Sequence, residues 1–158
     1  MNIFLNKKKF YLFILFYSLF AIFFALYIEF VLGYKPCKLC LYQRVPYIIA
    51  IFISFIGYNY FTNDKILILI IAIFTISFFI SGYHYGIENN IFEEFSGCTT
   101  KSLEIIDKSE ILKSLNNNIT SCKDVSFKLF GISLAGINLL LSLLVIAYSI
   151  RTLVYEKN

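Results

Sequence analysis

The chain has no tryptophan, one histidine and few charged residues, and each shortage narrows the class of protein. A single histidine cannot provide both axial ligands of a bis-histidine haem, which excludes a cytochrome of that kind. Charged residues make up only 15% of the 158 residues and apolar residues 59%, so the chain is more apolar than a soluble domain of this size needs to be. The net charge of +4 is modest and gives no reason to expect nucleic-acid binding. Composition therefore predicts a protein of the lipid bilayer, anchored at its interfaces by tyrosines in place of tryptophan.

Charge is almost absent from four long stretches. Each approaches the roughly 20 apolar residues that a helix needs to cross the hydrocarbon layer. Because the bilayer offers no water to satisfy backbone groups, we expect the four segments to be helices that pack together as a bundle. The first stretch is longer than a signal-peptide core and no small-x-small cleavage site follows it, so we expect it to stay as a helix. The sequence thus predicts an all-α membrane protein, a four-transmembrane-helix bundle in one domain, 1–158, with spans at about 10–29, 42–61, 66–84 and 129–150 and outer loops at about 30–41 and 85–128.

Four spans place both termini on one side of the membrane and both cysteine-bearing loops on the other. The lysines at 7–9 favour a cytoplasmic N-terminus, but Lys35, Lys38 and Arg44 in or near the first loop leave the charge balance close to a tie. Persistent disulfides belong outside the reducing cytosol, so we expect cytoplasmic termini and cysteine loops on the opposite side of the membrane. The second loop has an amphipathic pattern at about 103–115, typical of a short helix that either lies on the membrane or is solvated.

All four cysteines lie outside the predicted spans. Cys37 and Cys40 form a C-x-x-C pair, which is typical of a redox pair or of half a metal site. A four-thiolate zinc site usually uses two such pairs, whereas Cys98 and Cys122 are far apart in the second loop and the histidine is in another segment, so we expect no metal. A disulfide across so short a loop adds little stability, and a strained, exposed one is labile and oxidising. Thiol–disulfide exchange is the better interpretation of the first pair.

The second pair, Cys98 and Cys122, would on its own be typical of a structural disulfide that closes the long loop. Two pairs at one face of a membrane also allow oxidation to be relayed from one to the other. If the second helix begins near Cys40, its N-terminus and Arg44 one turn later would both lower the pKa of the Cys40 thiol. Two alternatives remain open, in which Pro46 marks the true first turn and Arg44 is only an anchor at the membrane surface.

His84 ends the third span on the same predicted face as Arg44. It either hydrogen-bonds a quinone head group, or supplies a proton when the quinone is reduced, or is an interfacial histidine satisfied by water. Glu88, one helical turn further on, is placed to fix the tautomer of the ring. Glu29, near the end of the first span, is expected to reach the head-group region.

Residues 37–47, which read Cys-Lys-Leu-Cys-Leu-Tyr-Gln-Arg-Val-Pro-Tyr, resemble the signature of the bacterial disulfide bond formation protein B (DsbB) family. Residues 83–88 resemble the segment after that family's third helix, and residues 130–138 resemble the start of its fourth. The resemblance implies a four-helix bundle of the bacterial inner membrane. It also implies a protein that reoxidises a periplasmic DsbA-like thiol oxidase and passes the electrons to a membrane quinone, either ubiquinone or menaquinone.

The resemblance also implies roles for single residues. Cys98 would be attacked by the reduced partner to give a mixed disulfide, and Cys122, once released, would pass electrons to Cys37. Cys40 would be the thiolate that meets the quinone, with Arg44 beside it. His84 is a further candidate at the quinone ring. The second loop lacks a tryptophan near its cysteines, which bears on the identity of the partner and not on the reaction.

Two other classes compete with this interpretation. A non-catalytic four-span scaffold of the tetraspanin type would hold its outer loop with disulfides and would need no arginine after the C-x-x-C. An enzyme resembling vitamin K epoxide reductase shares four spans and a C-x-x-C, but usually carries that motif near its last helices, whereas here it follows the first.

Overall fold

The fold is a bundle of four long helices, and it confirms the predicted class. The computed structural model describes residues 7–59, 64–93, 122–123, 127–129 and 131–155. Its helices are α1 (Lys7–Phe30), α2 (Lys38–Asn59), α3 (Asp64–Glu88) and α5 (Leu134–Tyr155), and a short hairpin pairs β1 (Lys128–Leu129) with β2 (Ile132–Ser133). All four helices are long and apolar enough to cross a membrane. The amphipathic helix predicted at 103–115 lies outside the described residues.

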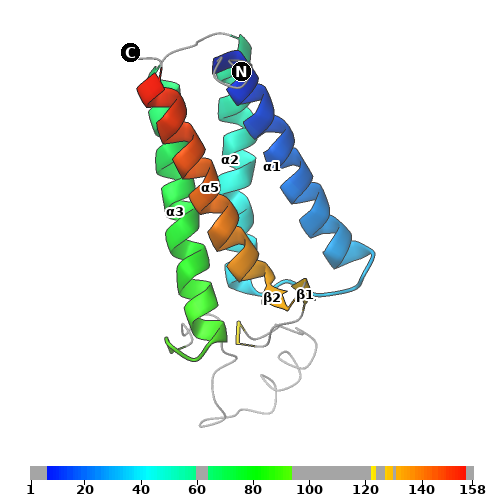
Figure 1. The fold of residues 1–158 in the computed structure, drawn as a ribbon. Helices are drawn as coiled ribbons and strands as arrows, with labels where there is room; N and C mark the ends of the chain where they lie inside the picture. Colours follow the sequence, from blue (N-terminus) through cyan, green and yellow to red (C-terminus); the bar gives the residue numbers. More distant parts are fainter. Residues whose placement is uncertain (1–6, 60–63, 94–121, 124–126, 130, 156–158) are drawn as a thin grey trace, which may run out of the picture.

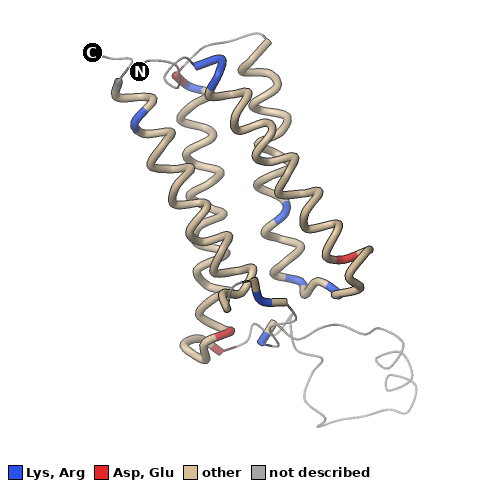
Figure 2. The backbone as a smooth tube through the Cα atoms, turned by 45° about the vertical axis from the view of Figure 1, so that its right-hand side comes forward, with Lys and Arg blue, Asp and Glu red and all other residues tan. Residues whose placement is uncertain are grey.

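The helices lie side by side, and α1 begins at the same end of the bundle at which α5 ends (Figure 1). The C-x-x-C turn before α2 and the end of α3 lie together at the opposite end. Charged residues gather near the two ends and leave the middle of the bundle almost free of charge (Figure 2). The outer faces carry large exposed apolar side chains, such as Phe16, Phe20 and Phe52. This distribution is that of a multi-pass membrane protein, whose outer surface is solvated by lipid.

Small polar residues line the helix contacts, as is common where helices pack inside a membrane. The Ser142 hydroxyl donates to the Ser77 hydroxyl at 3.1 Å and joins α5 to α3. The Tyr47 hydroxyl donates to the side-chain oxygen of Asn138 and joins α2 to α5. The buried apolar core packs around Tyr47 at the half of the bundle nearer the termini; its members are Phe10, Tyr11, Ile14, Tyr47, Ala50, Leu67, Ile70, Phe74 and Val145. The opposite end of the bundle contains the polar and sulfur-bearing side chains of the C-x-x-C, Gln43 and His84.

The fourth helix starts at Leu134, five residues later than the start predicted at 129. Apolar residues occupy positions 129, 130 and 132, but the backbone there turns, because Gly131 has a φ of +83° and the two flanking dipeptides pair as β1 and β2. A glycine adopts this left-handed conformation at little cost, and it is incompatible with a continuing helix. The α2 boundary also differs from one alternative, since Pro46 lies well inside the helix and not in its first turn.

The end of α3 is fixed by a Schellman motif. The Ile91 N–H donates to the Gly86 carbonyl at 2.8 Å, the Asn90 N–H donates to the Ile87 carbonyl at 3.0 Å, and Asn90 has the left-handed φ of 58° that the motif requires. The chain then turns back so that the Phe92 ring lies over Gly86. This cap holds Glu88, the last helical residue, at a defined position.

We expect Gly86→Ala to destabilise the protein by about 1–3 kcal/mol, because overpacking costs that much when the neighbour is a ring. A Cβ at Gly86 would lie 2.3 Å from the Phe92 ring. Gly82→Ala, one turn earlier on α3, is the matched control, since its Cβ would meet Leu139 at an ordinary 3.4 Å. Thermal unfolding in detergent compares the two variants. Equal unfolding temperatures would show that Phe92 moves aside freely.

Candidate redox site

Cys37 is the N-cap residue of α2. Its carbonyl accepts the first helical hydrogen bond, from the Leu41 N–H at 3.2 Å, and its sulfur accepts the Cys40 N–H at 3.3 Å. A side chain at the N-cap normally satisfies one of the free N–H groups of the first turn in this way. From the sequence, Cys40 was expected at the helix N-terminus if α2 began near it. The helix begins at Lys38, so Cys40 lies in its first turn, and the Cys37 sulfur is the one that accepts a free N–H group of that turn.

Three polar groups converge on the Cys37 sulfur. Besides the Cys40 N–H, the Cys40 sulfur lies 2.9 Å away and Nε2 of His84 lies 3.6 Å away. Both Cys37 and Cys40 are free thiols, so a single proton can be shared between the two sulfurs. Cys37 and His84 are buried, which strengthens these interactions by excluding water. The arrangement favours a thiolate at Cys37.

The pKa of the Cys37 thiol is accordingly lowered to about 4. The hydrogen bond from the Cys40 thiol is the largest cause, and the bond and positive field of His84 add to it, together outweighing the opposing effect of burial. A thiolate at the N-terminus of a helix is also favoured by the helix dipole. These contacts favour Cys37 over Cys40 as the thiolate of the reduced pair.

Gln43 orients the histidine, and sequence reasoning assigned it no role. Its Nε2 lies 3.1 Å from Nδ1 of His84, and both side chains are buried. An amide N–H can only donate, so Nδ1 is the acceptor and the proton of the neutral ring sits on Nε2, pointing toward Cys37. The available signal was a polar amide inside an apolar span, which needs a buried partner.

Replacing Gln43 by leucine removes the donor to Nδ1 and frees the His84 ring to rotate or change tautomer. We expect the fraction of Cys37 present as thiolate at acidic pH to fall, with a loss of turnover of about tenfold, the lower end for removing a partner that orients a reacting group. Ser54→Ala is the matched control, because that buried hydroxyl on the same helix has no hydrogen-bond partner among the described residues. The pH profile of Cys37 alkylation reports the change, and a profile identical to wild type would contradict it.

Arg44 is paired with Glu29, not with a cysteine, among the residues that the structure describes. Its Nη1 lies 2.5 Å from Oε2 of Glu29, and the pair joins α2 to α1 close to the cysteine end of the bundle. The expectation that Arg44 stabilises the Cys40 thiolate is therefore not met in this conformation. Removing one member of a partly buried ion pair leaves the other charge uncompensated, so the pair stabilises the orientation of α1 against α2.

Cys122 lies against the C-x-x-C turn. It is fully buried and packs in one cluster with Cys37, Leu39 and Ile87, and Cys40 packs at the edge of that cluster. Cys122 is disulfide-bonded, whereas Cys37 and Cys40 are not. The structure thus brings Cys37, Cys40, Cys122 and His84 into one site, while Cys98 lies outside the described residues.

The chain also matches known proteins. Over residues 7–151 it matches the family described as disulfide bond formation protein DsbB. It is 31% identical over 147 residues to the uncharacterized protein RP370 of Rickettsia prowazekii (strain Madrid E), in an alignment that covers 89% of this chain and 84% of that protein. The chain belongs to the DsbB family.

Membership of the DsbB family confirms the resemblance found in the sequence and establishes the general activity. The protein is a multi-pass membrane oxidoreductase of disulfide-bond formation. The clustered thiols described above are what such an activity requires, because exchange needs one thiolate and a second sulfur within reach. The scaffold and the vitamin K epoxide reductase alternatives lose their support.

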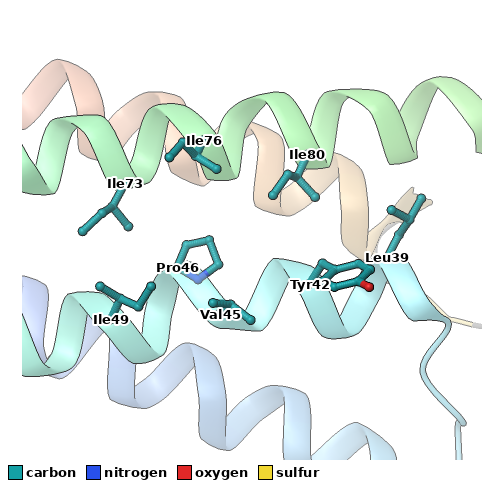
Figure 3. Close-up of a pocket in the computed structure, with 8 residues that line it drawn as sticks. All are labelled: Leu39, Tyr42, Val45, Pro46, Ile49, Ile73, Ile76 and Ile80. Carbon is teal, nitrogen blue, oxygen red and sulfur yellow. The ribbon is translucent and has the colours of Figure 1, made fainter.

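An apolar groove between α2 and α3 reaches this DsbB-type site. Its volume is about 290 Å³, and Figure 3 shows three isoleucines of α3 facing the side chains of α2 across it. The lining residues are Leu39, Tyr42, Val45, Pro46, Ile49, Ile73, Ile76 and Ile80. Leu39 belongs both to the groove and to the cluster around Cys37. The groove suits a long apolar chain whose polar end lies beside the C-x-x-C.

Proposed function

We propose that this protein reoxidises a periplasmic DsbA-like thiol oxidase and passes the electrons to a membrane quinone, either ubiquinone or menaquinone. The observation that supports it most is the convergence of the Cys40 sulfur, the Cys40 N–H and His84 Nε2 on the Cys37 sulfur, at the N-terminal end of the membrane-spanning helix α2. A thiolate beside a second thiol is the form that gives up two electrons as a disulfide closes. A lipid-soluble acceptor can reach it only at such a position.

The first half of the reaction is disulfide exchange with the partner. A thiolate of the reduced partner attacks Cys98 of an oxidised Cys98–Cys122 pair, and the partner's second thiol then resolves the mixed disulfide. Two electrons and the balance of protons pass to the loop cysteines, and the partner leaves oxidised. A partner at about −120 mV requires a more positive final acceptor, which a respiratory quinone supplies.

The second half moves the electrons within this chain. Cys122, once a thiolate, attacks a Cys37–Cys40 disulfide at Cys37, with which it already packs. Cys98 then closes on Cys122, which leaves Cys37 as the thiolate and Cys40 as the thiol. This thiolate–thiol pair transfers two electrons to the quinone, and the Cys37–Cys40 disulfide forms again. One proton of the quinol comes from the Cys40 thiol and the other from the solvent. His84 holds the proton-donating Nε2 beside the sulfur through each cycle.

The groove between α2 and α3 gives the quinone tail a place to lie. A polyprenyl chain in contact with Ile76 and Ile80 would bring its head group to Leu39, beside Cys40. For the partner to be periplasmic, the cysteine end of the bundle must face the periplasm and both termini the cytoplasm. This orientation is part of the proposal.

The test is a steady-state assay of the purified, oxidised protein in detergent. We expect quinone absorbance to fall only when protein, reduced DsbA-like partner and a ubiquinone or menaquinone analogue are all present. Fresh partner should sustain the reaction for many turnovers. If neither analogue is consumed while the partner is still oxidised stoichiometrically, the exchange half stands and quinone is not the acceptor. If the partner is not oxidised either, the proposal is wrong.

A further inference from the structure

Three potential metal ligands meet at the cysteine end of the bundle, and the carboxylate of Glu88 lies beside one of them. The two sulfurs of the C-x-x-C and Nε2 of His84 all lie within 4.8 Å of one another. Oε1 of Glu88 lies 3.7 Å from the same Nε2, and the Glu88 side chain is only 8% exposed. Its second oxygen is buried and has no hydrogen-bond partner among the described residues. A buried carboxylate without full compensation is costly, so it points to a cation as a missing partner.

The spacing of these atoms fits tetrahedral coordination by zinc. With Zn–S near 2.3 Å and Zn–N near 2.0 Å, a sulfur and a nitrogen on one ion are about 3.6 Å apart and two sulfurs about 3.8 Å apart. Cys37 Sγ and His84 Nε2 are already 3.6 Å apart. The two sulfurs, now 2.9 Å apart, would separate by a small rotation about the Cys40 side chain. Two thiolates, one imidazole and one carboxylate form a ligand set that zinc accepts.

The surroundings of His84 also suit a ligand. When Nε2 binds a metal, the proton of the ring moves to Nδ1, where it needs an acceptor. The Gln43 side chain lies 3.1 Å from Nδ1, and a half-turn of its amide replaces the donating nitrogen by the accepting oxygen. The Schellman cap after Glu88 and the N-cap at Cys37 hold the flanking backbones in place. The sequence expectation of no metal rested on the wide spacing of Cys98 and Cys122 and on the histidine being in another segment, and the fold removes the second ground.

We propose that the reduced protein binds one Zn²⁺ through Cys37, Cys40 and His84, with Glu88 as the fourth ligand, and that this holds the enzyme in an inactive state. Binding releases the remaining thiol proton to solvent and leaves the oxidation state of both sulfurs unchanged. Because both sulfurs are then bound to the metal, neither can attack a disulfide or give up electrons to an acceptor. The oxidised pair offers no thiolate and so no site. The inference goes beyond the proposed function, since metal binding is measured without partner or quinone.

The test is zinc binding to the full-length protein in detergent under anaerobic conditions. We expect the reduced protein to retain one equivalent of Zn²⁺ after desalting, measured by elemental analysis, and the oxidised protein to retain none. Cd²⁺ in place of Zn²⁺ should give the thiolate-to-metal absorbance that identifies sulfur ligands. Comparing two redox states of one folded chain makes this arm independent of whether any variant folds. Equal retention in both states, or none in either, would overturn the proposal.

Variants locate the site. A Cys98→Ser, Cys122→Ser double variant keeps only the C-x-x-C thiols and should still bind one equivalent when reduced. Glu88→Gln should weaken binding by about tenfold to a hundredfold, whereas Glu93→Gln, an acid just beyond α3, is the matched control and should leave it unchanged. If the double variant binds nothing, the loop cysteines hold the metal. If the two glutamate variants bind alike, Glu88 is not a ligand, and either result contradicts the site as assigned.

Discussion

Cys40→Ala will abolish quinone reduction, lowering the steady-state rate by at least about a thousandfold. The electrons leave the C-x-x-C as a disulfide closes, and with one sulfur removed no disulfide can close. Cys37 keeps His84 beside its sulfur in this variant. It should therefore still attack the Cys98–Cys122 disulfide at Cys122, release Cys98 and stay trapped in the mixed disulfide. Quinone absorbance measures the rate, and non-reducing gel electrophoresis followed by peptide mapping identifies the trapped species.

Cys122→Ala is the contrast, because it interrupts the relay before the C-x-x-C. We expect it to lose partner-dependent turnover, yet its chemically reduced Cys37–Cys40 pair should still reduce quinone in a single turnover. Single-turnover quinone reduction that is kept in Cys122→Ala and lost in Cys40→Ala would distinguish a relay from four cysteines that act independently. Retained single-turnover activity in Cys40→Ala would contradict the assignment of that pair as the exit for electrons.

The second large effect concerns the titration of Cys37. Its pKa of about 4 means that alkylation of the reduced protein should stay on a plateau from neutral pH down to about pH 5 and fall by half near pH 4. An ordinary thiol with a pKa near 8.5 loses reactivity tenfold per pH unit over the same range. Because rates also depend on intrinsic nucleophilicity, the midpoint and not the absolute rate is the quantity to compare.

His84→Phe should raise that midpoint by about one unit or more, since the phenyl ring offers neither the Nε2–H nor the positive field. The sign also bears on redox poise. Lowering the pKa of the Cys37 thiol stabilises the reduced pair relative to the disulfide. This stabilisation is complete above the ordinary thiol pKa, and it is lost as the pH falls through about 4. At neutral pH the Cys37–Cys40 disulfide is thereby made more oxidising, as accepting electrons from a partner requires. A midpoint unchanged in His84→Phe would remove the histidine from this role.

The sequence predicted the fold well because the signal was long and uninterrupted. Four apolar stretches of membrane-spanning length leave few alternatives, and all four helices are present. The start of α5 was misplaced because the apolar residues at 129, 130 and 132 run on into the span, and only the left-handed Gly131, in the turn of the hairpin, marks the later start. The C-x-x-C identified the chemistry, since such a pair is rarely used for stability alone.

Single-residue roles depended on contacts that spacing does not reveal. Placing the helix start near Cys40 shifts the N-cap by less than one turn, yet it misses the contacts of the Cys37 sulfur with the Cys40 N–H and with His84. By sequence spacing Arg44 was paired with Cys40, one turn earlier on the same helix, whereas its partner in the structure is Glu29 on α1. Gln43 lies in the same short run, but its role follows from a ring on α3. A polar residue inside an apolar span indicates that a hydrogen-bond partner exists, but the identity of that partner depends on how the helices pack.

The central claim is that the Cys37–Cys40 dithiol gives its electrons to quinone, and a single-turnover measurement without any partner tests it most directly. The protein is reduced, freed of reductant and mixed anaerobically with excess quinone analogue. We predict one quinol formed per C-x-x-C pair, together with a Cys37–Cys40 disulfide identified by mass spectrometry. A dithiol that survives unoxidised with bound quinone present, in a protein that is folded and free of metal, would contradict the account.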